Sequence, residues 1–168
     1  MFTTNSTFDS YGTTVFELMS RLAVEHKSIN LGQGFPDDYG PNAVLQKASE
    51  YLFDLPNQYP PMLGVPKLRQ AVAAHNKRFY GLDIDWKTET MVSSGATEGL
   101  AACFLGLLNQ GDEVVVIEPL YDCYLPMIER AGGIPKRVSI EPPEWKLNGS
   151  ALRAAFSNKT KLVLINSP

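Results

Sequence analysis

Two short runs of apolar residues constrain the fold of this 168-residue chain more than any other feature. They are VVVI at residues 114–117 and LVLI at residues 162–165, and each is apolar at successive positions. Strands of this kind need cover on both faces, which is typical of a parallel sheet flanked by helices. Stretches with helical spacing of apolar residues alternate with these runs. The sequence therefore predicts a layered α/β domain.

Apolar spacing also locates the individual elements. Residues 1–14 are polar and are expected to form an arm without a core of its own. Gly81 is well placed to end a helix. The expected helices are 15–25, one that starts at Pro41, 66–80, 96–109, 121–131 and 149–157, and the expected strands are 90–93, 113–117, 135–138 and 161–165.

The last of these strands, in KLVLINSP, reaches Pro168 without the crossover helix that a parallel sheet next requires. We therefore expect an N-terminal helical arm followed by the first part of a mostly parallel, helix-flanked sheet that is incomplete at its C-terminal end. The expected division is an arm and a shaped loop at 1–40, a helical segment at 41–85 and a partial α/β domain at 86–168.

Composition narrows the classes of partner. The formal net charge of −3 gives no electrostatic reason to expect nucleic acid or an anionic membrane surface as a partner. The two cysteines, Cys103 and Cys123, fit neither a disulfide framework nor a zinc spacing. No stretch has the length of a membrane span, and the N-terminus lacks the pattern of a secretory signal. These features predict a cytoplasmic protein with a small-molecule ligand and no metal.

A serine-glycine turn, SSGAT at residues 93–97, joins an expected strand to an expected helix. Glycine at position 95 allows close backbone approach, and Ala96 and Thr97 offer the unpaired N–H groups of a first helical turn to an anion such as phosphate. A plain helix cap by Ser94 or Thr97 is an alternative of equal weight for this segment alone. The turn is neither a Walker loop nor the three-glycine dinucleotide motif.

A second motif, EPLYDCY at residues 118–124, follows the expected strand 113–117. Ligands of open parallel sheets bind at the carboxyl ends of the strands, so Tyr121 and the glycine turn are expected at the same edge. The Tyr121 ring could stack on a flat heterocycle, while packing against the start of a helix is the alternative. Taken together, the turn and the ring predict a site for a planar, phosphorylated cofactor.

Several motifs in order carry a resemblance to a known family. INLGQGFPD, NQYPPMLGVPKLR, SSGATEGL, EPLYDCY and INSP occur here in the order and spacing of the pyridoxal-phosphate-dependent class I/II aminotransferases, which have fold type I. The chain is most similar to the branch with kynurenine, glutamine and methionine aminotransferases. The resemblance extends from about Gly12 to Pro168.

The resemblance implies roles for individual residues. Tyr59 is similar to a tyrosine that reaches the neighbouring subunit's cofactor phosphate across a dimer interface, with an ordinary loop aromatic as the alternative. Gly34 resembles a loop position beside the substrate carboxylate, with a tight turn as the alternative. The residues that resemble the cofactor site are Gly95, Ala96 and Thr97 for the phosphate, Tyr121 for the pyridine ring, and Tyr59.

The implied activity is transfer of an amino group from an amino acid to a 2-oxo acid through pyridoxal 5'-phosphate, by a homodimer. This chemistry needs a Schiff-base lysine. In the family that lysine lies beyond the Asn-x-Pro segment, so we expect it beyond Pro168 and no catalytic residue within the chain. The 168 residues are thus expected to be an N-terminal fragment that is inactive alone.

Two other functions are compatible with the same residues. A pyridoxal-phosphate-dependent carbon–sulfur lyase of the same fold has similar N-terminal motifs. A non-catalytic module that keeps the phosphate turn and binds a phosphorylated ligand or a partner subunit is the alternative from another class.

Overall fold

The structure, a computed structural model, describes residues 3–34, 36 and 38–167. The chain divides into two compact units. The first unit comprises the described residues of Met1–Thr13 and Ser94–Pro168, and the second is formed by those of Thr14–Ser93. The N-terminal segment therefore belongs to the unit that contains the C-terminal half of the chain.

A three-stranded parallel sheet is the centre of the first unit. Strand β1 (Glu113–Glu118) lies between β2 (Ile134–Ser139) and β3 (Thr160–Leu164), in the order β2-β1-β3. Because β1 has a hydrogen-bonded neighbour on each side and helices over each face, residues 114–116 are at most 1% exposed. The predicted parallel, helix-flanked sheet is confirmed.

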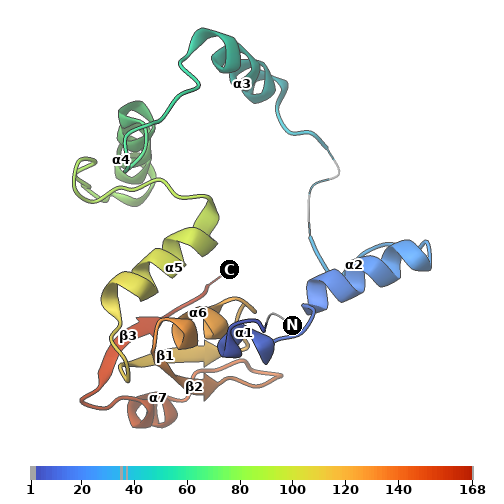
Figure 1. Ribbon diagram of the computed structural model, residues 1–168, viewed down its shortest axis with the longest axis vertical. Helices are drawn as coiled ribbons and strands as arrows, with labels where there is room; N and C mark the ends of the chain where they lie inside the picture. The colour runs from blue at the N-terminus through green and yellow to red at the C-terminus, as the bar shows by residue number, and fades with distance from the viewer. Residues whose placement is uncertain (1–2, 35, 37, 168) are drawn as a thin grey trace. The chain divides into compact units, whose positions relative to one another are not determined.

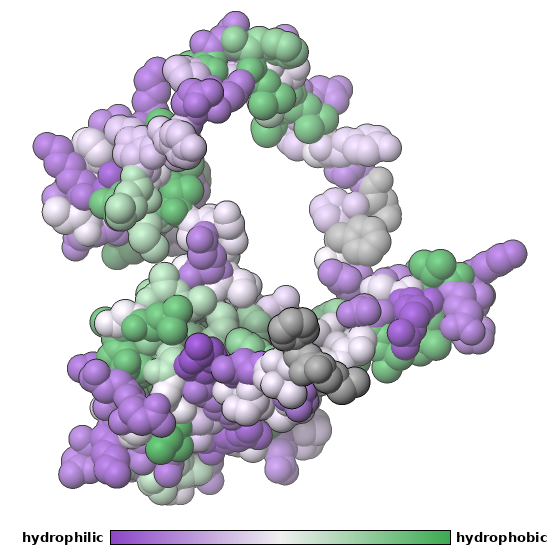
Figure 2. Space-filling model, viewed as in Figure 1, coloured by the Kyte–Doolittle hydropathy of each residue, from purple (hydrophilic) through white to green (hydrophobic). Residues whose placement is uncertain are grey.

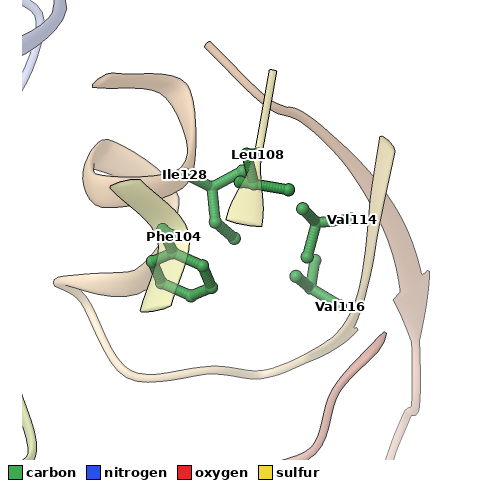
Figure 3. Close-up of a cluster of buried hydrophobic side chains, with 5 residues drawn as sticks. All are labelled: Phe104, Leu108, Val114, Val116 and Ile128. Carbon is green, nitrogen blue, oxygen red and sulfur yellow. The ribbon is translucent and has the colours of Figure 1, made fainter. Parts of the chain in front are cut away.

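Side chains of β1 alternate between two apolar clusters, as the period of a strand requires. Helices α5 (Gly95–Leu107) and α6 (Tyr124–Arg130) lie over one face, and α7 (Gly149–Ala155) lies over the other (Figure 1). The larger cluster fills the space between β1 and helices α5 and α6 (Figure 3). Its buried members are Phe104, Leu108, Val114, Val116 and Ile128, and those of the opposite cluster are Val115, Val138 and Ala155.

The N-terminal segment contains a short helix that the sequence pattern did not predict. Helix α1 (Ser6–Asp9) begins after Asn5, whose side chain accepts a hydrogen bond from the Thr7 N–H group. The Tyr11 hydroxyl donates a 2.9 Å hydrogen bond to Oε2 of Glu129, which belongs to α6. This contact ties the N-terminal segment to the first unit.

The second unit contains helices α2 (Val15–Glu25), α3 (Asn42–Asp54) and α4 (Pro66–Tyr80). Gly81 ends α4 in the left-handed region, with φ of +68°, as predicted. The buried residue of α4 is Arg69, whose guanidinium donates 2.8 Å hydrogen bonds to the carbonyl oxygens of Lys87 and Thr90. These bonds fasten the segment that follows α4 onto the helix.

The strand predicted at residues 90–93 is wrong for the structure as described. The Val92 N–H group donates a 3.1 Å hydrogen bond to the carbonyl oxygen of Leu63, in a loop of the second unit, and residues 90–93 take no part in the sheet. An apolar run indicates that a segment will be covered, but it does not choose its hydrogen-bonding partner.

Helix α3 exposes much of its apolar surface. Val44, Leu52 and Phe53 are all more than 60% exposed, and α3 contains no buried residue. Hydrophobic residues stand beside hydrophilic ones along the surface of the second unit (Figure 2). Burial within this unit therefore contributes little to the stability of α3. Within the described part of the chain, none of the helices combines the length and the apolar character needed to cross a membrane.

We expect Gly133→Ala to destabilise the first unit by about 1–3 kcal/mol, because overpacking strains a filled core. A Cβ atom at Gly133 would lie 2.9 Å from Cγ2 of Ile128 and 3.0 Å from Cδ1 of Leu108. Gly106→Ala is the matched control, since a Cβ atom there meets nothing within 4 Å and alanine favours a helix. Urea unfolding measures both changes, and equal stabilities would contradict the close packing.

Candidate ligand-binding site

A cleft of about 330 Å³ opens in the first unit where strands β1 and β3 end. It is formed by the start of α5, by the segment between β1 and α6 with the first residue of α6, and by Asn166, which follows β3. This is the edge of a parallel sheet at which ligands bind. The residues that line it are Ala96, Thr97, Leu100, Tyr121, Tyr124 and Asn166.

The first turn of α5 supplies backbone N–H groups to this cleft. Gly95 has φ of +77°, a conformation that side chains disfavour, and a Cβ atom there would meet nothing within 4 Å. In a helix the N–H groups of Ala96 and Thr97 have no intrahelical acceptor. Both residues line the cleft, so the geometry suits an anion placed before the helix.

Capping of α5 differs from the plain serine cap considered above. The Ser94 side chain makes no capping hydrogen bond. Instead the Ser94 N–H group donates to the Glu98 carboxylate, one turn into the helix. The Thr97 side chain is hydrogen-bonded to Cys123. Neither the Ser94 side chain nor the Thr97 side chain therefore caps the N-terminus of α5.

Tyr121 lines the same cleft as Ala96 and Thr97. It follows β1, and the residue is 45% exposed. The centroid of the Tyr121 ring lies 5.7 Å from that of Tyr124, with the planes inclined by 60°. The structure therefore brings Ala96 and Thr97 of the serine-glycine turn and the Tyr121 side chain into one cleft, as the sequence predicted for one edge of the sheet.

Tyr124 and Asn166 are cleft residues to which the sequence motifs assigned no role. The Tyr124 hydroxyl donates a 3.2 Å hydrogen bond to Oδ1 of Asn166. Burial raises the pKa of the Tyr124 hydroxyl, with further increases from Cys123 and Tyr121, so the group stays a donor at neutral pH. Two sequence signals were available: the helical spacing of Tyr121 and Tyr124, and the position of Asn166 just after an apolar strand.

The two other predicted site residues, Tyr59 and Gly34, lie in the second unit. Tyr59 is 99% exposed, and Gly34 is also on the surface. In the motif GQGFPD, residues 35 and 37 lie outside the described residues. The roles predicted for Tyr59 and Gly34 stay predictions.

The cleft fits a planar, phosphorylated group. Its volume lies in the range of small-molecule sites, about 300–1,000 Å³. One wall offers N–H groups for an anion, and another offers an aromatic ring for a flat heterocycle. The lining residues include no lysine, and the described residues contain no group of three His, Cys, Asp or Glu side chains that could hold a metal ion.

The pH dependence of the rate at which Cys123 is alkylated tests the surroundings of this thiol. Burial raises the pKa of the Cys123 thiol, and the hydrogen bond with Thr97 opposes that increase. A higher pKa leaves less thiolate at pH 8, and the thiolate is the nucleophile. We therefore expect iodoacetamide to alkylate Cys123, in a Cys103→Ser background, more slowly at pH 8 than a cysteine in an unstructured peptide.

Thr97→Val should slow this alkylation further, because it removes the hydrogen bond that lowers the pKa of Cys123. The pH dependence of the alkylation rate, measured by mass spectrometry, separates a pKa effect from restricted access. A rate equal to that of the peptide at every pH would contradict the burial of the thiol.

The fold and the cleft define an α/β protein with a candidate ligand cleft at the carboxyl edge of a parallel sheet. Comparison with known families gives a more specific result. Residues 26–168 match the family model described as aminotransferase class I and II, so the chain belongs to this family. Members of the family use pyridoxal phosphate.

Individual relatives agree with this assignment. Methionine aminotransferase of Escherichia coli is 42% identical over 157 residues, which are 94% of this chain and 41% of that protein. A probable N-succinyldiaminopimelate aminotransferase of Mycobacterium tuberculosis is 46% identical over 160 residues, 94% of this chain and 40% of the relative. Kynurenine–oxoglutarate transaminase of Dictyostelium discoideum is 36% identical over 176 residues, 95% of this chain and 40% of the relative.

Solved structures give the same result. The structure of the Escherichia coli methionine aminotransferase has a TM-score of 0.91 and 40% identity, and the match covers 97% of this chain and 43% of that one. The N-succinyldiaminopimelate aminotransferase from Mycobacterium tuberculosis has a TM-score of 0.92 and 45% identity, with 99% and 44% covered. The chain thus spans about two fifths of the length of these relatives.

Proposed function

We propose that the protein is an aminotransferase that moves an amino group from an amino acid to a 2-oxo acid through pyridoxal 5'-phosphate. One observation carries this proposal: Ala96, Thr97 and Tyr121 line a single cleft in a chain that belongs to the class I and II aminotransferases. When bound, the cofactor supplies an electron sink for chemistry at the α-carbon of an amino acid.

Each residue has a defined part in binding. The first-turn N–H groups of Ala96 and Thr97 would donate to the phosphate, and Gly95 would keep the approach open. The Tyr121 ring would lie against the pyridine ring and shield that face from water. Since no lysine lines the cleft within the described residues, the lysine that holds the cofactor covalently would come from another part of the protein.

The proposed assembly is a homodimer. Tyr59 would reach the cofactor phosphate of the partner subunit, and its exposure of 99% leaves the side chain available for such a contact. The exposed apolar side chains of α3 support association with another surface. Gly34 would lie beside the substrate carboxylate. We also retain two expectations as proposals. One is the division of this chain into segments 1–40, 41–85 and 86–168, and the other is a cytoplasmic location of the whole protein.

For the amino donor we propose the thioether and aromatic amino acids, or glutamine. Relatives named for methionine and kynurenine support the first two classes. These relatives act on methionine and kynurenine, as their names state.

The test uses the complete translation product of the gene. It is titrated with pyridoxal phosphate, then supplied with methionine, kynurenine or glutamine and a 2-oxo acid, and the new amino and oxo acids are measured by mass spectrometry. Borohydride reduction should trap a lysine adduct. Absence of both the adduct and amino-group transfer would overturn the proposal.

Pyruvate and ammonia released from a cysteine conjugate without an oxo-acid acceptor would identify a carbon–sulfur lyase, and binding without reaction would identify a non-catalytic module.

A further inference from the structure

Tyr124 and Asn166 join two walls of the cleft that are distant in sequence. Tyr124 begins α6, and Asn166 follows β3, 42 positions later in the chain. The hydrogen bond between them, 3.2 Å from the Tyr124 hydroxyl to Oδ1 of Asn166, joins the two walls, and both residues line the cleft with Thr97 and Tyr121.

This hydrogen bond determines which end of the Asn166 amide remains for a ligand. A primary amide carries an oxygen that accepts and a nitrogen that donates two hydrogen bonds. Because Oδ1 accepts from Tyr124, the Nδ2 group is the donor that Asn166 has left for the cleft. A held side chain binds more strongly than a mobile one, since less rotamer freedom is lost on binding.

The surroundings of the Tyr124 side chain favour its hydrogen bond with Asn166. Tyr124 is 9% exposed, whereas Asn166 is exposed at the cleft. The other side chains that line the space around the pair are apolar, namely Val116, Ile117, Leu120 and Leu164. A hydroxyl beside apolar side chains is costly to leave unpaired, so its hydrogen bond with Asn166 is favoured.

We propose that Tyr124 is a positioning residue that holds Asn166 with its amide N–H groups toward the cleft, where they donate a hydrogen bond to an oxygen of the bound cofactor. This inference rests on the proposed function, because it takes pyridoxal phosphate as the ligand. It adds a donor that follows β3 to the N–H groups of the first turn of α5, and it assigns Tyr124 an indirect part in binding.

The test measures the dissociation constant of pyridoxal phosphate by calorimetry on the complete translation product. Tyr124→Phe should weaken binding about fivefold, as expected for loss of one ordering hydrogen bond. Asn166→Asp should weaken it at least about tenfold, because a carboxylate has no N–H group and repels an anionic ligand. Tyr11→Phe is the matched control, since it removes a hydroxyl hydrogen-bonded to Glu129 in the same unit and should leave the dissociation constant unchanged.

Two further measurements separate positioning from general stability. In an Asn166→Ala background, Tyr124→Phe should have no additional effect on binding, whereas a destabilising change would add to it. In ¹⁵N-labelled protein, the side-chain amide signal of Asn166, identified by its loss in Asn166→Asp, should shift on addition of pyridoxal phosphate in the wild type and shift less in Tyr124→Phe.

The outcomes are distinguishable. Wild-type binding with a Tyr124→Phe constant equal to that of the wild type would overturn this inference and leave the proposed function intact. No wild-type binding would overturn both. A weaker Tyr124→Phe complex, an unchanged Tyr11→Phe complex and no additional effect in the Asn166→Ala background would support both.

Discussion

Replacing Ile128 with alanine should lower the free energy of unfolding by about 2–5 kcal/mol, the range for deleting a fully buried aliphatic side chain. Ile128 is 0% exposed, and its side chain packs from α6 against the central strand β1 (Figure 3). Its neighbours in the cluster, among them Phe104 and Val114, are themselves held by the sheet and α5, so the cavity would not close.

Urea unfolding of the complete translation product measures this loss. Ile134→Ala removes the same atoms from β2, but Ile134 is 47% exposed, so its loss should stay below about 1 kcal/mol. Similar losses at both positions would show that Ile128 does not occupy the core of the first unit.

The second large effect concerns ligand affinity. Ala96→Asp should weaken binding of pyridoxal phosphate at least about 100-fold, because two like charges about 4 Å apart near a protein surface repel by a few kcal/mol. The same substitution should not destabilise the protein, since an acidic residue in the first turn is favourable for a helix. Affinity and stability are thus expected to change in different directions.

Ser150→Asp is the matched control for this experiment. Ser150 is the second residue of α7, as Ala96 is the second residue of α5, but it does not line the cleft. Calorimetric titration should find wild-type affinity for Ser150→Asp. If Ala96→Asp binds as tightly as the wild type, the phosphate does not lie at the start of α5.

Local signals allowed much of the fold to be predicted from the sequence. Helix α4 has the predicted bounds because Pro66 is favourable in the first turn and Gly81 accepts a positive φ. Strand β1 was identifiable because apolar residues at successive positions require cover on both faces. The order β2-β1-β3, in contrast, depends on which strands pair, and periodicity does not contain that information.

The candidate site likewise has a part that local sequence signals predict and a part that depends on strand pairing. Tyr121 could be assigned to the carboxyl edge because it follows the apolar strand β1. Thr97 lies at the same cleft although the strand expected before it, 90–93, is absent from the sheet. The contact of Tyr124 with Asn166 could not be predicted, since it exists only because β3 pairs with β1. The apolar stripe of α3 predicted a helix correctly, but the pattern does not identify the surface that covers Phe53.

The hydrogen bond from Tyr11 to Glu129 has a consequence for synthesis on the ribosome. Its partners are 118 positions apart, and a ribosome adds about 5–20 residues per second. The N-terminal segment must therefore wait several seconds without its native contacts, while residues 14–93 have already emerged. Nascent chains halted before residue 129 should leave this segment open to proteolysis, and longer ones should protect it.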